Sequence, residues 1–181
     1  MRTPSAAVRT RLLVATALFA ACLAAAPTAD AQVEEWTLYG GVFDLDRELE
    51  TWEVGVEARF GVFEIPLGSR FALPVEPGVG LMGHGEGGGY AYATFRVPFD
   101  RLWPERWPQR LRVTPYTGVG YYEPGDGKDL GGPVEFRSGI DLGWRAGERL
   151  WIGLSFYHLS NAVLYDENPG EESLVLTLSW R

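Results

Sequence analysis

The stretch Thr51–Val62, TWEVGVEARFGV, decides the fold class because its alternate residues have opposite character. The apolar half of the alternation comprises Trp52, Val54, Val56, Ala58, Phe60 and Val62. The polar half comprises Glu53, Gly55, Glu57, Arg59 and Gly61. Successive side chains of a β-strand point to opposite faces, so this period of two predicts a strand with one apolar and one polar face.

The same alternation recurs along the rest of the chain. In Val134–Arg145, VEFRSGIDLGWR, the apolar series is Val134, Phe136, Ile140, Leu142 and Trp144, and it alternates with acids, arginines and glycines. No helical period competes with it after residue 32, and turns rich in glycine, proline and acids separate the segments. We expect eight strands, at residues 36–43, 51–64, 71–83, 89–99, 110–122, 132–145, 149–160 and 172–180.

Composition narrows the class of protein. The chain has 181 residues, which suits one domain, and its 23 glycines favour turn-rich β structure. With 24 acidic against 16 basic residues the net charge is −8, which argues against a nucleic-acid partner. A single cysteine excludes both a disulfide framework and a cysteine-built zinc site.

The first 31 residues are expected to be a cleaved export signal. Three arginines in the first eleven residues precede an apolar run over 12–26, and Ala29-Asp30-Ala31 has the small-residue form of a cleavage site. The remaining domain, 32–181, would hold 150 residues with 13 bases and 23 acids, a net charge of −10.

Eight strands of about ten residues, an even strand number and an export signal predict an all-β fold, an eight-stranded antiparallel outer-membrane β-barrel. Its apolar face would meet lipid, and its polar face would fill a narrow interior with ion pairs and hydrogen bonds. A soluble lipid-binding barrel is the alternative, since it shows the same alternation with the apolar face turned inward. In the membrane barrel both termini would face the periplasm, and the loop at about 161–171 would lie at the cell surface.

Three polar residues interrupt the apolar faces of the last two strands. In the strand expected at 149–160, one face carries Ile152, Leu154 and Phe156, and the next two residues on that face are His158 and Ser160. In the final strand, Leu178, Leu176 and Leu174 lead back to Glu172 on the equivalent face. If the two strands pair, all three polar side chains gather at one end of the barrel wall.

A histidine, a serine and a carboxylate are the parts of a hydrolytic triad. Residues i and i+2 of a strand lie about 6.6 Å apart, so the imidazole of His158 can reach Ser160 as general base while Glu172 orients the ring. Asp166 and Glu167 are alternative acids if the register differs. The competing interpretation is a polar barrel rim without catalysis, because polar residues near a membrane interface cost only about 0–1 kcal/mol.

At these residues the chain resembles the PagL-type lipid A 3-O-deacylases, an outer-membrane acyloxyacyl hydrolase-like family. The family pattern is His-x-Ser-Asn with an asparagine ten residues and the catalytic acid fourteen residues after the histidine. Here His158, Ser160 and Asn161 are followed by Asn168 and Glu172 at those spacings. The match is specific over about 156–180.

The resemblance implies a serine esterase that removes the 3-O-linked acyl chain of lipid A in lipopolysaccharide of the outer leaflet. Ser160 would attack the ester carbonyl with His158 as base, and Asn168, Asn161 or backbone N–H groups near Ala162 and Val163 would stabilise the oxyanion. The triad requires no metal or other cofactor. A structural or adhesive barrel is the non-enzymatic alternative.

The end of the chain departs from the usual pattern of this class. Outer-membrane barrels usually end in an aromatic residue, whereas here Arg181 follows Trp180, which is expected to make membrane insertion less efficient without altering the fold. His84, within the glycine-rich stretch 82–89, and Lys128 are expected to lie in solvated loops.

Overall fold

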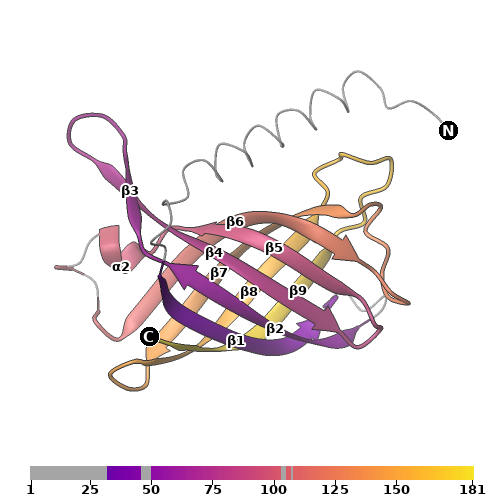
Figure 1. Ribbon diagram of the computed structural model, residues 1–181, viewed down its shortest axis with the longest axis horizontal. Coiled ribbons are helices and arrows are strands. Elements are labelled where there is room, and N and C mark those ends of the chain that lie inside the picture. The colour runs from indigo at the N-terminus through magenta and orange to yellow at the C-terminus, as the bar shows by residue number, and fades with distance from the viewer. Residues whose placement is uncertain (1–31, 46–49, 103–104, 107) are drawn as a thin grey trace.

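The alternating strands close into a barrel (Figure 1). A computed structural model describes residues 32–45, 50–102, 105–106 and 108–181. Its barrel strands are β1 (Val33–Phe43), β2 (Thr51–Phe60), β4 (Ala72–His84), β5 (Gly89–Arg96), β6 (Leu111–Glu123), β7 (Val134–Arg145), β8 (Leu150–Ser160) and β9 (Glu171–Trp180). Neighbouring strands are antiparallel in the order β2-β1-β9-β8-β7-β6-β5-β4, and pairing of β2 with β4 completes the ring. The predicted eight-stranded antiparallel barrel is confirmed, while the expected signal segment, 1–31, lies outside the described residues.

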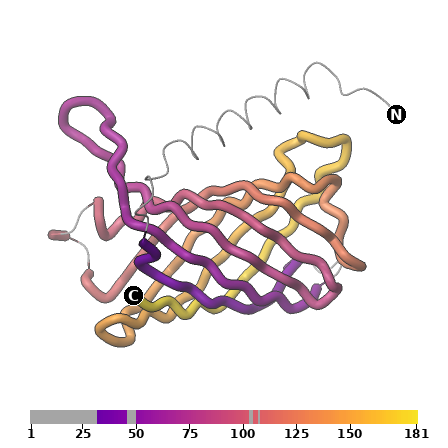
Figure 2. Tube along the Cα trace, in the orientation of Figure 1, coloured from indigo at the N-terminus to yellow at the C-terminus, as the bar shows by residue number. Residues whose placement is uncertain are grey.

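The strand expected at 51–64 is divided in the structure. β2 ends at Phe60 because its partner β1 begins at Val33, directly opposite. The following strand β3 (Phe63–Pro66) pairs only with the first residues of β4, and this hairpin projects from the barrel (Figure 2). The strand expected at 89–99 likewise stops at Arg96, before Pro98, and a short helix α2 (Phe99–Leu102) follows. Among the described residues, no helix is long and apolar enough to cross a membrane.

The two ends of the barrel differ. The start of β1 and the C-terminus lie at one end, called here the terminal end, and the β8–β9 loop lies at the opposite, distal end (Figure 1). At the terminal end, Arg181 Nε donates to Glu35 Oε2 at 2.8 Å and its backbone N–H donates to the carbonyl of Arg149. The final arginine is therefore part of the barrel and helps close it.

The outer wall is apolar, as the alternation predicts. Large exposed apolar side chains include Trp52, Val54, Leu81, Leu142, Trp144, Ile152, Leu154, Leu176 and Leu178. The interior instead holds buried charged and hydroxyl groups. A soluble lipid-binding barrel needs the reverse arrangement, so this alternative is contradicted.

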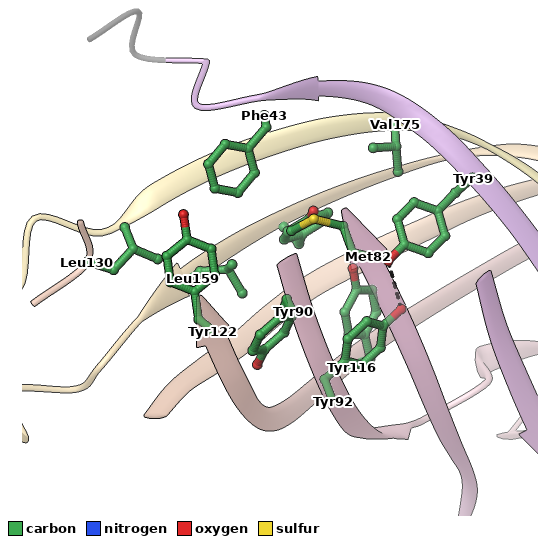
Figure 3. Close-up of a cluster of buried hydrophobic side chains, with 11 residues drawn as sticks. Tyr39, Phe43, Met82, Tyr90, Tyr92, Tyr116, Tyr122, Leu130, Leu159 and Val175 are labelled. Carbon is green, nitrogen blue, oxygen red and sulfur yellow. Dashed lines mark hydrogen bonds between the residues drawn. The ribbon is translucent and has the colours of Figure 1, made fainter. Parts of the chain in front are cut away.

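Ion pairs and aromatic rings fill the interior. Near the terminal end, Arg59 donates to Glu35, Glu57 and Asp141 at 2.8–3.0 Å. Midway, the buried guanidinium of Arg137 lies over the ring of Tyr157 at 3.6 Å. Three more tyrosine rings surround it, those of Tyr39, Tyr92 and Tyr116. They belong to a cluster of buried side chains in which Tyr39 and Tyr92 are hydrogen bonded (Figure 3).

Two residues expected in solvated loops are buried instead. His84 is the last residue of β4, is 4% exposed and stacks on Phe43 with ring centroids 4.7 Å apart. Lys128 is 5% exposed, and its Nζ donates to Asp44 Oδ1 at 2.7 Å. Both predictions were wrong because the partners that bury these residues come from the end of β1, far away in sequence.

Candidate active site

The predicted histidine and glutamate meet on the outer wall. His158 of β8 and Glu172 of β9 face one another in the strand register. His158 Nδ1 lies 3.0 Å from Glu172 Oε1, and the two side chains are 42% and 40% exposed. A carboxylate accepts hydrogen bonds, so Nδ1 is assigned as the donor in this contact, and the other ring nitrogen, Nε2, takes no part in it. Neither Asp166 nor Glu167 takes this place.

Ser160 lies on the same strand face as His158. It is the last residue of β8, two positions further toward the distal end, and is partly exposed. Within the described part of the chain, its hydroxyl forms no hydrogen bond with the His158 ring. The structure therefore brings His158 and Glu172 into contact and leaves Ser160 beside them, at the approximate 6.6 Å Cα spacing of alternate strand residues.

Gly170 covers the free edge of the imidazole. It has a left-handed backbone, with φ of +67°, and directly precedes β9. A Cβ at this position would lie 2.7 Å from His158 Cε1 and 3.3 Å from Nε2. Only glycine brings the backbone this close without displacing the ring. Asn168-Pro169-Gly170 has the composition of a turn, but nothing in the sequence indicates this contact.

The two candidate asparagines have different environments. Asn161 is buried, and its Nδ2 donates to the carbonyls of Leu130 at 2.8 Å and Glu167 at 2.7 Å. Asn168 is exposed, and its Oδ1 accepts from the backbone N–H of Asn161 at 2.9 Å. The amide of Asn168 is thus oriented through its oxygen, while its Nδ2 donates to no residue that the structure describes.

The loop between the two asparagines has an unusual backbone. Ala162 and Val163 have successive positive φ angles of 51° and 62°, although neither is glycine. Such conformations are strained for residues with a Cβ, and they cluster where a surrounding structure fixes them for function. Both residues are exposed at the distal end, next to Ser160.

Neighbouring strands extend this polar site sideways. Ser138 of β7 faces His158 in the register, and Thr117 of β6 faces Ser138. Both side chains are exposed on the outer wall. Sequence reasoning missed them, although a gap in each apolar series, at 138 in β7 and at 115–117 in β6, could have indicated them.

Comparison with known proteins identifies the chain. The family model described as lipid A 3-O-deacylase (PagL) matches residues 28–181. The chain belongs to the PagL family. Its resemblance to this family, predicted from the histidine, serine and glutamate spacing, is thereby confirmed.

Solved structures agree with the fold. A structure described as the crystal structure of the outer membrane enzyme PagL has a TM-score of 0.59 and 19% identity, covering 81% of this chain and 99% of that one. A de novo designed transmembrane β-barrel has a TM-score of 0.53 and 11% identity, covering 84% of this chain and 98% of its own. No curated protein sequence matches. The chain is an outer-membrane β-barrel, and its apolar wall faces lipid.

The described residues contain no group of three or more histidine, cysteine or acidic side chains positioned to hold a metal ion.

Proposed function

We propose that this PagL-family barrel hydrolyses the 3-O-linked acyl ester of lipid A with Ser160 as nucleophile, His158 as general base and Glu172 as the group that orients the imidazole. The observation that carries the proposal is the 3.0 Å contact between His158 Nδ1 and Glu172 Oε1 on a wall that faces lipid. A histidine–carboxylate pair is costly on a wall that faces lipid, and a catalytic role would account for this cost.

The reaction takes two steps. His158 Nε2 accepts the proton of Ser160 as its Oγ attacks the ester carbonyl, and the C–O bond to the sugar breaks. The sugar oxygen leaves with the proton from His158, and an acyl-serine remains. Water then attacks this ester with His158 again as base, which releases the fatty acid and restores Ser160. Contacts between nucleophile and base are often long before substrate binds, so the open Ser160–His158 spacing is compatible with this sequence.

The oxyanion requires donors that are fixed in advance. Asn168 is the better candidate, since the Asn161 backbone fixes its Oδ1 and its Nδ2 is left to donate. We assign Asn161 a positioning role, because both of its own Nδ2 contacts are to loop carbonyls. Backbone N–H groups of the strained 162–163 turn are further candidates.

The location suits a lipid substrate. The distal end would face outward, so that the acyl ester of an outer-leaflet lipid lies at the depth of Ser160 while its chains run down the apolar wall below. In the middle of the barrel, the space left between Arg59, Arg96 and Arg137 is about 10 Å³, enough for about one water molecule and not for an acyl chain.

The test is a mass spectrum of lipid A after incubation with the refolded barrel and with Ser160→Ala. We expect the wild type to remove the 3-O-linked acyl mass and the variant to lose at least about 10³-fold in rate. Ser155→Ala is the matched control, since Ser155 lies on the same strand but is buried inside and bonded to Tyr116. Unchanged lipid A with a folded wild-type barrel would favour the non-enzymatic alternative.

Ser138 is the other serine beside His158, and the same assay distinguishes the two. The His158 ring is turned toward β9, where it meets Glu172, and so away from Ser138 on β7. Continued acyl loss with Ser160→Ala together with inactivity of Ser138→Ala would reverse the assignment of the nucleophile.

A further inference from the structure

The turn that follows β1 contains a buried aspartate in a left-handed conformation. Asp44 comes directly after Phe43, the last residue of β1, and has a φ of 63°. Aspartate, asparagine and glycine adopt this conformation more readily than other residues. The side chain of Asp44 is 0% exposed. Burial of a charge and a left-handed backbone both cost free energy, so the contacts around this turn must hold it in place.

The turn extends the contact between β1 and β9 beyond the point where their ladder stops. The register of these two strands ends at Val42 with Leu174. Further along, the backbone N–H of Leu45 donates to the carbonyl of Glu172 at 2.8 Å. On its other side Glu172 faces His158 of β8. The candidate acid is therefore held between the histidine on one side and this turn on the other.

A second N–H group of the turn contacts the glutamate next to the candidate acid. The backbone N–H of Asp44 donates to Oε2 of Glu171 at 3.3 Å, and the hydroxyl of Ser173 donates to the same oxygen at 2.9 Å. Glu171 and Ser173 are both buried in the barrel. Two successive N–H groups of one turn thus hold the first two residues of β9.

The side chain of Asp44 connects the turn to the opposite side of the barrel. Its Oδ1 accepts from Nζ of Lys128 at 2.7 Å, and the carbonyl of Lys128 accepts from the hydroxyl of Tyr122 at 3.0 Å. Lys128 lies between β6 and β7, and β6 is opposite β1 in the ring of eight strands. The buried ion pair therefore crosses the distal end and holds the left-handed turn from the other side.

We propose that Asp44 is a positioning residue for the reaction on the outer wall. Its left-handed turn presents the Leu45 N–H to the Glu172 carbonyl, which keeps the carboxylate of Glu172 in hydrogen-bonding reach of His158. The inference rests on the proposed function and adds to it a residue from inside the barrel. The groups of a catalytic site must be held within about 0.5 Å and 10–20° of the productive geometry. Glu172 is only the second residue of β9, so the turn replaces a strand partner that β1 no longer provides there.

The first test separates the turn from the charge. Lys128→Met/Asp44→Asn removes both charges and keeps a residue that accepts a left-handed backbone. Lys128→Met/Asp44→Val removes the same charges and introduces a β-branched residue that this backbone strongly disfavours. We expect the asparagine variant to keep kcat for lipid A within about twofold of Lys128→Met, and the valine variant to lose about 10- to 100-fold with KM unchanged. Lys128→Met/Asp44→Ala, which imposes less strain, should lie between them.

The control imposes similar strain on a turn away from the site. Gly87, between β4 and β5, has a φ of +78° and no atom within 4 Å of its would-be Cβ. In the ring of strands, β5 lies opposite β9. Gly87→Val should lose unfolding free energy in urea and keep the wild-type kcat. A loss of kcat as large as that of Lys128→Met/Asp44→Val would attribute the effect to strain in general and overturn the proposal.

A second readout does not depend on turnover. The chain contains two histidines, so selective isotope labelling of histidine gives two imidazoles to observe by NMR of the refolded barrel. The signals absent from His158→Ala identify His158. In the wild type and in Lys128→Met/Asp44→Asn, we expect the Nδ1 proton of His158 to be shifted downfield by its hydrogen bond to Glu172. In Lys128→Met/Asp44→Val this proton should move toward its position in Glu172→Gln.

The two readouts distinguish failure of this inference from failure of the proposed function. If no barrel hydrolysed lipid A but the Nδ1 proton still depended on the residue at position 44, the proposed function would be contradicted and the positioning role supported. A valine variant with the Nδ1 proton and kcat of the asparagine variant would overturn the positioning role, whether both variants resembled the wild type or both had lost activity.

Discussion

Replacement of Gly170 by alanine tests whether the position of the His158 ring controls the reaction. The new Cβ would lie 2.7 Å from His158 Cε1, where ordinary contacts start near 3.4 Å, so the ring must move by at least about 0.7 Å. Misplacement of a catalytic group by about 1 Å can cost 10²-fold in rate. We therefore expect Gly170→Ala to lower kcat for lipid A deacylation by about 10- to 100-fold.

Backbone strain is a second consequence of this substitution and needs its own control. Alanine in a left-handed conformation costs about 1–2 kcal/mol, and Gly170 has φ of +67°. Gly87, in the distal β4–β5 turn, has φ of +78° and no atom within 4 Å of its would-be Cβ. Gly87→Ala thus imposes similar strain without touching the imidazole.

The assay measures kcat and KM by mass spectrometry and stability by urea unfolding of the refolded barrels. Both variants should lose similar unfolding free energy, and only Gly170→Ala should lose kcat. Equal kcat values for Gly170→Ala, Gly87→Ala and the wild type would refute the idea that the loop backbone holds the ring in place.

Three further changes test other contacts. Glu172→Gln should lower kcat by about 10²–10³-fold with little change in KM. This loss of kcat is smaller than the approximately 10⁴-fold known for a buried triad aspartate, because water reaches the half-exposed His158–Glu172 pair; an unaltered kcat would count against an orienting role. Asn161→Ala should destabilise the 161–170 loop by about 2–3 kcal/mol, seen as faster hydrogen exchange there, since two carbonyls lose their donor; unchanged exchange would contradict this. Lys128→Met should lower the free energy of unfolding, measured in urea, by about 3–5 kcal/mol, because Asp44 stays buried without this cation. The double variant Lys128→Met/Asp44→Asn should regain part of this loss, and full stability of Lys128→Met would show that the ion pair contributes nothing.

The fold was accessible from sequence because a strand's period of two directly assigns every residue to a face. The same rule located His158, Ser160 and Glu172 as polar interruptions of an apolar face. That all three residues lie at the same end of the barrel followed from the antiparallel pairing of the last two strands. These inferences needed only short-range information, namely parity along each strand and one hairpin.

Other features depended on long-range contacts that parity does not encode. Lys128 is buried by Asp44, which lies 84 positions away in sequence, and His84 is buried beneath Phe43. A glycine-rich segment viewed alone resembles a solvated loop whether or not another strand covers it. The division of the strand expected at 51–64 was also hidden, because it depends on where the neighbouring strand begins.

Thr117 and Ser138 show that a signal can be visible in the sequence and still have no interpretation there. The missing apolar residues at Thr117 and Ser138 are evident in each strand by itself. A single polar residue on a lipid-facing strand carries little information, however, since its lateral neighbours are unknown. Only the register, which places Ser138 between Thr117 and His158, turns two isolated exceptions into part of one row.

The filled middle of the barrel supports our proposal that the chemistry takes place on the outer wall. Arg137 and the tyrosine rings around it occupy the middle of the barrel, and ion pairs such as Arg59 with Glu35 occupy the terminal half. An acyl chain cannot enter such an interior without breaking buried ion pairs, each of which leaves an uncompensated charge when one partner is removed. A lipid ester can reach a side chain on the wall without leaving the membrane. If the barrel acts on a lipid, we therefore expect it to do so through polar residues on its wall, and the proposed site at His158, Ser160 and Glu172 meets this condition, with Ser138 and Thr117 beside it.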